Sequence, residues 1–369
     1  MRYKAEIMAI TPIHIGSGDK ALYGLDFFRE EKTIKMIDFY RLKERINEIE
    51  ENLTKIMNLK EEEKKVRREE KRKIRIREEV RNIKEINEKI LKDVSRRNPE
   101  AVRYAIKSNA EVDRDVETII KLNSSPYIPG SSIKGALRTA YLYEYGKGKI
   151  DAIAKEKVGA ALRDRKGIKG IKEALKNANA EIKGEFDEVF KNFVVRDTKE
   201  KQIKCSSVYD SKILTRRGEY PHQFLEAIDP GESFITEIIF DESKIKLRDL
   251  ILCLRNFSSA ILNHEKEFFK KNYHYNLSFH LLEGVELEEN EALLRLGKGT
   301  GHHSKAGWST FDSYLDMISE ETCYLLVKAM KIAREKKWIA EPFPISRRIV
   351  RVGNKWHQLG WAKISFERI

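Results

Sequence analysis

Hydrophobic and polar residues alternate at the start of the chain and predict a strand over residues 2–10. A period of two is the spacing of a strand with one buried face. The apolar positions are Tyr3, Ala5, Ile7 and Ala9. The strand should end at Thr11-Pro12, before a loop with two glycines, and residues 33–37 predict a second strand.

The spacing changes between residues 41 and 97, where it predicts helices. The apolar positions follow steps of three and four: Ile46, Ile49, Leu53 and Ile56, then Val80, Ile83, Ile90 and Val94. Nearly every residue between these two stripes is charged, so that stretch is either a solvated projecting helix or the tip of a helical hairpin. A further helical stretch is expected over about 100–122.

The rest of the chain mixes both kinds of element. We expect a loop and a helix over 123–143, helices with loops over 147–190, strands over 193–240, and a helix over about 247–271. Residues 275–283 and 291–296 are ambiguous. Residues 308–337 look helical, and the tail predicts a strand pair around Gly353-Asn354. Strands interrupted by helical insertions favour an α+β core.

The charge of the chain indicates a class of binding partner. Of the 369 residues 36% are charged, and 72 Lys and Arg against 59 Asp and Glu give a net charge of +13. Such an excess suits a polyanion. Residues 41–97 hold 20 basic and 14 acidic residues. That mixture favours a solvated, ion-paired helix over a dedicated RNA-binding arm.

The cysteines and the N-terminus bear on location. Cys205, Cys253 and Cys323 are too far apart for a CxxC zinc site, and nothing indicates a disulfide framework. The start of the chain lacks the apolar core of a signal peptide, and there is no run of 18 apolar residues. We therefore expect a cytoplasmic protein that does not bind membranes.

The sharpest local feature is the loop and helix start at 128–140. Glycine permits unusual backbone conformations, and a serine there would cap a helix that begins near Ile133. Two cations four residues apart share a helical face. Together these groups predict a phosphate-binding site, although an ordinary capped helix explains the spacing equally well. The residues are Gly130, Ser131, Ser132, Lys134 and Arg138.

A second glycine-rich loop spans 296–307. Closely spaced glycines let a backbone approach a ligand, the lysines supply charge, and histidines can stack on bases. The candidate RNA-binding residues are Gly297, Lys298, Gly299, Thr300, Gly301, His302, His303, Ser304 and Lys305. The loop lacks the strand, helix and downstream acid of a dinucleotide site.

The strand end at 11–19 adds His14, Gly16, Ser17 and Asp19. His14 alternates with Ile13 and Ile15, so it should point away from their face. A structural role is favoured for this histidine. The open alternative is general acid–base cleavage of RNA that uses the 2′-hydroxyl as the nucleophile.

Other candidate residues favour structural roles. Asp38 and Asp197 lie near predicted strand ends, where capping is favoured over metal binding. Four tryptophans come late, with Arg347, Arg348, Arg351 and Lys355 nearby, and core packing and subunit contact are favoured over a basic aromatic surface. They are Trp308, Trp338, Trp356 and Trp361. No nucleophile–base pair and no metal or cofactor motif is present, so we expect no catalytic residue, metal or cofactor.

Three strings in this order resemble the RAMP superfamily of CRISPR proteins: TPIHIGSGD, YIPGSSIKGALRTAYL and RLGKGTGHHSKAG. Together with FVVRDT and EAIDPGESFITEIIF they look most similar to the family of fifth subunits of type III-A Csm effector complexes. The polar pair His302-His303 departs from the family pattern and leaves its role open.

The resemblance implies a ferredoxin-like, RRM-type core with large helical insertions. The core would comprise 1–40, 123–143 and 193–369, with a charged helical insertion at 41–122 and a second at 144–192. It also implies a non-catalytic subunit that binds crRNA near its 3′ end, caps the RAMP filament and supports 3′-end maturation in antiviral defence. The implied partners are crRNA, target RNA, backbone RAMP and small subunits, and recruited nucleases.

Two alternatives stay open. One is a metal-independent endoribonuclease that processes precursor crRNA through His14 or the histidines at 302 and 303. The other is an assembly protein that binds its partners through the charged helix and the late tryptophans.

Overall fold

The computed structural model describes residues 1–66, 69–146, 149–215, 218–272, 277–301, 325, 328–329 and 346–369. The helices are α1 (Ile46–Lys65), α2 (Glu70–Arg97), α3 (Gly130–Tyr145), α4 (Lys149–Ala154), α5 (Ala160–Arg163), α6 (Ile168–Phe190), α7 (Leu247–Asn272) and α8 (His280–Glu283). The strands are β1 (Arg2–Ala9), β2 (Gly16–Ala21), β3 (Phe27–Glu30), β4 (Thr33–Ile37), β5 (Val102–Ser108), β6 (Val116–Ile119), β7 (Lys121–Leu122), β8 (Ser125–Pro126), β9 (Val194–Val195), β10 (Ser206–Thr215), β11 (Gly218–Glu219), β12 (Gln223–Ile228), β13 (Ser233–Ile239), β14 (Glu291–Arg295), β15 (Arg347–Val352), β16 (Lys355–Gln358) and β17 (Trp361–Arg368).

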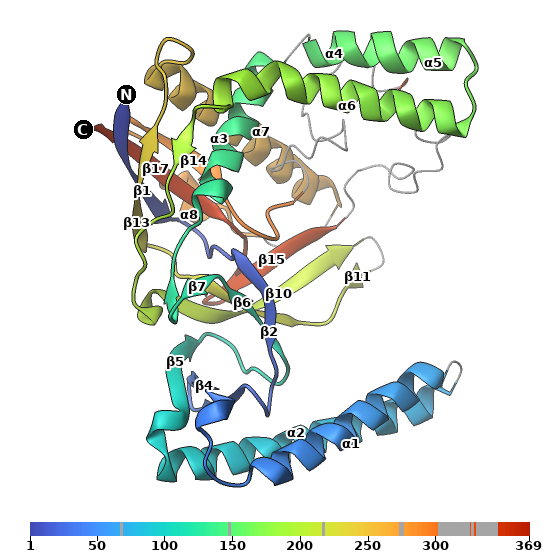
Figure 1. The fold of residues 1–369 in the computed structure, drawn as a ribbon, viewed down its shortest axis with the longest axis vertical. Coiled ribbons are helices and arrows are strands. Elements are labelled where there is room, and N and C mark those ends of the chain that lie inside the picture. Colours follow the sequence, from blue (N-terminus) through green and yellow to red (C-terminus); the bar gives the residue numbers. More distant parts are fainter. Residues whose placement is uncertain are drawn as a thin grey trace.

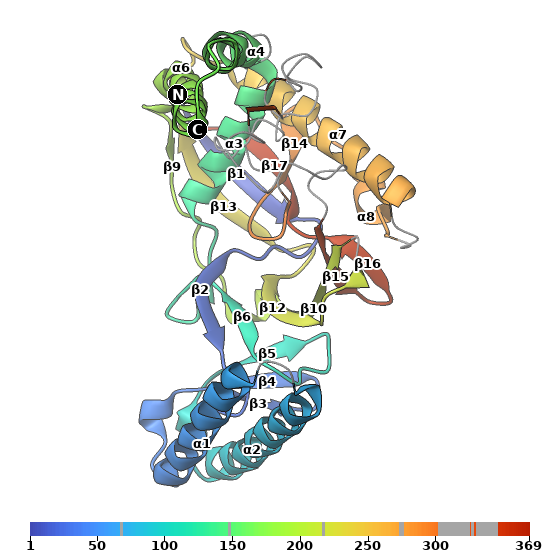
Figure 2. The ribbon, with the colours of Figure 1, turned by 90° about the vertical axis from the view of Figure 1, so that its right-hand side faces the viewer.

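The first sheet has the order β14-β17-β1-β13-β9, and every neighbouring pair in it is antiparallel. Along the chain β1, α3, β9, β13, α7 and β17 follow the β-α-β-β-α-β sequence of a ferredoxin-like unit, and β14 adds an edge strand. The predicted α+β, ferredoxin-like core with helical insertions is thus confirmed. Helices α3 and α7 pack beside each other against this sheet (Figure 2).

The alternation at the N-terminus explains why β1 occupies the centre of this sheet. Tyr3, Ala5, Ile7 and Ala9 are all buried, whereas the residues between them are mostly exposed. Their side chains join the large apolar cluster that also takes in the inner faces of α3 and α7. A strand buried on one face and paired on both edges is fixed in register.

The second sheet runs β2-β6-β12-β10-β5-β4-β3, and β10 also pairs with β15, which pairs with β16. The chain passes from β1 into this sheet through residues 10–15, where the backbones of Ile13 and Ile228 hydrogen-bond to each other. The strand predicted at 33–37 is β4, and the strand pair predicted in the tail is β15 and β16. Figure 1 shows the second sheet between the ferredoxin-like unit and the α1–α2 hairpin.

The charged stretch forms an antiparallel hairpin, α1 and α2, that projects from the sheet (Figure 1). Ion pairs join the two helices near the tip, with Arg72 to Glu62 at 2.8 Å and Arg77 to Glu63 at 2.5 Å. At the base, the buried apolar stripe packs on β3 and β4. The favoured solvated, ion-paired helix therefore agrees with the contacts along this hairpin.

The helix expected over 100–122 is wrong. Residues 102–108 form β5, which pairs with β4 and β10, and residues 116–119 form β6, which pairs with β2 and β12. Their partners lie far away in the sequence, so local spacing carried little information about them. The helices expected over 147–190 are present as α4, α5 and α6, whereas most of 308–337 lies outside the described residues. The proposed division of the chain into one core and two insertions stays a prediction.

The described part of the chain has no features of a membrane-spanning helix or of a metal site. None of its helices has the length and apolar character needed to cross a bilayer. It also has no group of three or more His, Cys, Asp or Glu side chains placed to hold a metal ion.

Candidate nucleic-acid interface

Two of the three predicted segments come together at the junction of the two sheets. The backbone N–H of Lys298 donates to the carbonyl of His14 at 2.7 Å. Gly297 has a φ of +86°, and a Cβ at that position would lie 2.4 Å from the same carbonyl oxygen. The glycine-rich loop therefore packs directly on the strand end, which brings residues almost 300 positions apart into one place.

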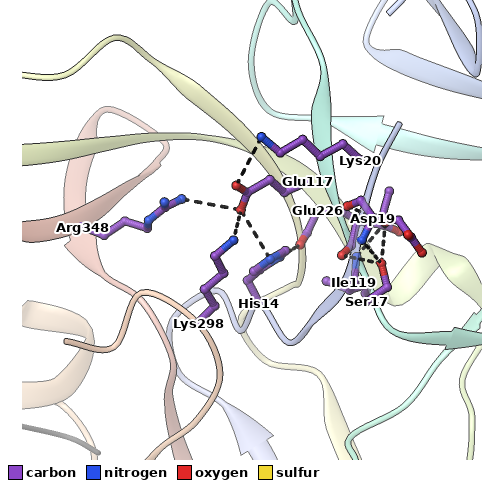
Figure 3. Close-up of polar contacts among 10 residues, drawn as sticks. His14, Ser17, Asp19, Lys20, Glu117, Ile119, Glu226, Lys298 and Arg348 are labelled. Carbon is purple, nitrogen blue, oxygen red and sulfur yellow. Dashed lines mark hydrogen bonds and ion pairs between the residues drawn. The ribbon is translucent and has the colours of Figure 1, made fainter. Parts of the chain in front are cut away.

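Glu117 on β6 lies at the centre of this junction (Figure 3). Its carboxylate accepts a hydrogen bond from Nζ of Lys298 at 2.9 Å. Three other basic nitrogens are farther from it: Nζ of Lys20 at 4.0 Å, Nη1 of Arg348 at 3.8 Å and Nε2 of His14 at 3.8 Å. We call Glu117 and these four basic residues the Glu117 cluster.

The Glu117 cluster has a net positive charge and is partly shielded from solvent. It contains one carboxylate and the permanent cations Lys20, Lys298 and Arg348. Burial raises the pKa of Glu117, but the hydrogen bond from Lys298 and the charge of Arg348 outweigh it, so the pKa lies below its usual value. Glu117 is therefore ionised near pH 7. Its side chain is 14% exposed and that of Arg348 13%, whereas that of Lys298 is 53% exposed.

The imidazole of His14 has a defined tautomer. Its Nδ1 lies 2.6 Å from the backbone carbonyl of Glu226, and a carbonyl only accepts, so Nδ1 carries the hydrogen. Burial lowers the pKa of His14, and Lys298 and Arg348 lower it further, against the raising effects of the Glu226 carbonyl and Glu117. The ring is thus neutral near pH 7 and Nε2 has a free lone pair. This Nε2 is buried and has no hydrogen-bond partner among the residues that the structure describes.

The guanidinium of Arg348 also uses only part of its hydrogen-bonding capacity. Its Nη1 is buried and makes no hydrogen bond to any described residue. Neighbouring residues on a strand point to opposite faces, and the preceding Arg347 turns inward. There its Nε donates to both carboxylate oxygens of Glu265 on α7 at 2.9 Å. This buried pair anchors β15 to α7 and holds Arg348 at the cluster.

Other predicted residues support the loop or lie beside the cluster. A Cβ at Gly299 would meet Cδ of Arg348 at 2.8 Å, and one at Gly16 would meet Nε2 of His14 at 3.1 Å. The buried Thr300 hydroxyl donates to the carbonyl of Gly297 at 3.1 Å. Gly301 has a φ of +87° with open space around it. His302, His303, Ser304 and Lys305 lie outside the described residues.

Ser17 and Asp19 form a separate small group. The hydroxyl of Ser17 lies 2.8 Å from that of Thr118, and the backbone N–H of Asp19 donates to Ser17 Oγ at 3.1 Å. Thr118 follows Glu117 on β6, so its side chain points to the other face of the sheet. Figure 3 shows Ser17 and Asp19 apart from the cations around Glu117.

The loop at 128–140 is built differently from the prediction. Helix α3 begins at Gly130, with Pro129 as N-cap and no side-chain cap, so the expected capping by Ser131 or Ser132 before Ile133 is wrong. Asp197 accepts from the backbone N–H of Gly130 at 2.7 Å. A carboxylate therefore already occupies the helix start, which satisfies one of the exposed N–H groups that a phosphate would need.

The glycine in this loop serves packing. A Cβ at Gly130 would lie 2.2 Å from the carbonyl oxygen of Val195, so only glycine fits against the chain after β9. Lys134 and Arg138 follow on α3 and are both half-buried. Asp197 thus caps a helix distant in sequence. Asp38 caps its own following turn, as favoured, because it accepts from the N–H of Tyr40 at 3.2 Å.

Sequence reasoning missed three members of the Glu117 cluster. Arg348 was noted only as part of a basic tail, and no motif marks Lys20 or Glu117. Lys20 faces Glu117 as a cross-strand neighbour of β2 and β6, a pairing that depends on the unpredicted β6. Of the late tryptophans, Trp361 is fully buried and lies under Arg295, in agreement with core packing.

Comparisons with known proteins place this geometry in context. A search of curated proteins found no match. A chain of the cryo-EM structure of a Csm–crRNA–target RNA ternary complex of a type III-A CRISPR-Cas system is similar in fold, with a TM-score of 0.65 and 21% identity; the match covers 99% of this chain and 100% of that one. The crystal structure of T. onnurineus Csm5 matches with a TM-score of 0.55 and 20% identity over 97% of this chain and 99% of that one.

These two similarities are at low identity and concern the fold. The family model of the RAMP superfamily matches residues 6–302, which include β1, the α1–α2 hairpin, α3 and the start of the glycine-rich loop. This chain therefore belongs to the RAMP superfamily.

Proposed function

We propose that this chain is a crRNA-binding RAMP subunit of a type III-A Csm effector complex. In this role it caps the 3′-end side of the RAMP filament, supports assembly and crRNA 3′-end maturation, and is not itself a nuclease. Its partners would be crRNA and target RNA, neighbouring backbone and small subunits, and recruited nucleases in the cytoplasm. The similarity to a chain of a Csm–crRNA–target RNA complex supports this assignment.

The observation that carries the proposal is the Glu117 cluster. Lys20, Lys298 and Arg348 converge where the strand end and the glycine-rich loop meet. Cations and a close backbone suit the phosphate and ribose groups of single-stranded RNA, which carry no sequence information. A protein that holds guides of varied sequence needs this kind of contact.

The test is equilibrium binding of the purified full chain to single-stranded RNA in buffer with a metal chelator. We expect salt-sensitive binding that Lys298→Ala with Arg348→Ala weakens by at least about tenfold, because charge-assisted contacts are lost. Lys4→Ala with Lys244→Ala is the matched control, since it removes two cations elsewhere. Equal weakening by both pairs, or no binding by the wild type, contradicts the proposal.

One observation favours a second candidate function, metal-independent RNA cleavage. The unprotonated Nε2 of His14 is a base that could take the proton of a 2′-hydroxyl. The same incubations separate the two functions when the RNA is analysed for length. We expect intact RNA; specific cleavage that His14→Ala abolishes would establish the endoribonuclease instead.

A further inference from the structure

The Glu117 cluster has more donors than its carboxylate satisfies. Of its four basic residues, only Lys298 lies within hydrogen-bond distance, while the nitrogens of Arg348, His14 and Lys20 lie at 3.8–4.0 Å. A buried charged or polar group without a hydrogen-bond partner destabilises the folded protein. The cluster is therefore built for a larger acceptor than the one it holds.

Two buried atoms indicate the chemistry of that acceptor. Among the described residues, Nη1 of Arg348 is a donor without a hydrogen bond, and Nε2 of His14 is an acceptor without one. Both lie 3.8 Å from the same oxygen of Glu117. A ligand that satisfies both needs an anionic oxygen for Arg348 and a hydroxyl for His14, side by side. A ribonucleotide has this combination, because its 2′-hydroxyl lies next to its 3′-phosphate.

We propose that Glu117 occupies the place of an RNA phosphate and is displaced from it when RNA binds. The incoming phosphate takes hydrogen bonds from Lys298 and Arg348, and the neighbouring 2′-hydroxyl donates to Nε2 of His14. The absence of a side chain at Gly16 keeps the space beside Nε2 free of a Cβ, which would lie only 3.1 Å from that atom. This inference rests on the proposed RNA binding. It adds that the carboxylate of Glu117 competes with the RNA phosphate and that the site prefers ribose to deoxyribose.

A direct consequence concerns the charge of Glu117. While ionised, the carboxylate neutralises cations that RNA needs, so it acts as an internal competitor. Glu117→Gln retains the shape and removes the charge. It should therefore bind RNA more tightly than the wild type, which is the opposite of what a positioning carboxylate would do.

The experiment measures the affinity of the full chain for a fluorescent oligouridylate of about twelve nucleotides. We expect Glu117→Gln to bind about tenfold more tightly, similar to the gain from one charge-assisted hydrogen bond. Glu367→Gln is the matched control: Glu367 also accepts from a lysine, Lys4, at 2.9 Å, and its loss changes the net charge equally. The gain should disappear when Arg348→Ala is combined with Glu117→Gln.

A second measurement replaces the RNA with the corresponding oligodeoxyuridylate. His14→Asn keeps a donor near the Glu226 carbonyl but loses Nε2, so the preference for RNA over DNA should fall to near one. The Lys298→Ala variant should lose affinity for both oligonucleotides and keep the preference. A preference unchanged in His14→Asn would overturn the role of the hydroxyl.

The outcomes separate this inference from the proposed function. If Glu117→Gln binds no better than Glu367→Gln while Lys298→Ala still weakens binding, the displacement is wrong and the RNA site stands. If the wild type binds no RNA, the proposed function itself fails. Thermal unfolding checks that each variant folds, and Glu117→Asp, whose shorter side chain withdraws from Lys298, gives the same test if Glu117→Gln does not fold.

Discussion

The backbone of Gly297 lies so close to the carbonyl of His14 that its conformation and its lack of a side chain are both required. Gly297→Ala should lower the free energy of unfolding by about 2–4 kcal/mol, because it adds a backbone clash to a left-handed conformation. Gly301→Ala is the control, since Gly301 has nearly the same φ but open space around it. Its cost should be only about 1 kcal/mol.

Denaturant unfolding of both variants measures this difference directly. Equal costs at the two positions would show that the glycine-rich loop does not pack on the strand end as described. Because this contact builds the Glu117 cluster, such a result would also weaken the proposed RNA site.

For individual residues, the sequence predicted part of the candidate site. His14 and Lys298 stand in glycine-containing strings that mark a loop, and the structure brings them together. Glu117 stands in no such string. A glutamate in a short strand is common, so its role becomes visible only when its neighbours in space are known. Ser131 and Ser132 show the opposite case: their local pattern predicts a cap, but Asp197, from a distant part of the chain, occupies that place.

Among the elements, the β15–β16 hairpin introduces a dependence of stability on pH. Burial, and after it the nearby His280, lower the pKa of His357 to about 4. In the unfolded chain a histidine has a pKa of about 6.5, so the unfolded state binds this proton first. The stabilisation is complete above pH 6.5 and declines as the pH falls from there toward 4.

The free energy of unfolding should therefore decrease between pH 7 and pH 5, where carboxylates contribute little. His357→Gln should show a smaller decrease over the same interval, whatever its absolute stability. A variant with the full wild-type pH dependence would assign the effect to other groups, His14 first, because its pKa is also lowered by burial.

The α1–α2 hairpin allows a clean test of the charged tip. Asn52 and Asn87 hydrogen-bond at 2.7 Å near the base, and ion pairs continue the same antiparallel alignment toward the tip. Residues 59 and 80 therefore lie roughly opposite each other, and a short glycine–serine turn can replace residues 60–79.

This deletion should leave the RNA affinity within about threefold of the wild type, because the ion-paired tip adds little net charge. Assembly with neighbouring subunits should weaken if the tip is a partner surface. The measurements are RNA binding and co-purification with coexpressed subunits. A loss of RNA affinity beyond about tenfold would make the hairpin an RNA-binding arm after all.

The strands β5 and β6 show where prediction of elements fails. Each is short, and each pairs with segments that are distant in sequence, such as 33–37 and 224–225. The long elements β1 and α7 were predicted within a few residues, and the helical stretch predicted over 41–97 contains α1 and α2, although the turn between them was not predicted. The spacing of apolar residues within a segment indicates which of its faces is buried. It does not indicate which strands the segment pairs with, because that depends on the whole fold.

For the whole molecule, charge alone is a poor guide to the interface. Residues 41–97 account for +6 of the net +13, yet many of these charges are paired on the hairpin surface. The RNA site we propose involves three cations gathered from β2, the glycine-rich loop and β15. Each of the three RAMP-like strings is a short local pattern, so their order could predict the family and its ferredoxin-like core. The arrangement of the Glu117 cluster depends on contacts between distant segments, so it is visible only in the folded chain.

The most direct test of the account is to capture the tagged full chain from its host under native conditions and sequence the RNA bound to it. We predict short RNAs with a shared repeat-derived part and varied guide sequences, recovered together with other RAMP subunits. Recovery of the chain alone, or with RNA that lacks this shared part, would contradict its assignment as an RNA-holding subunit.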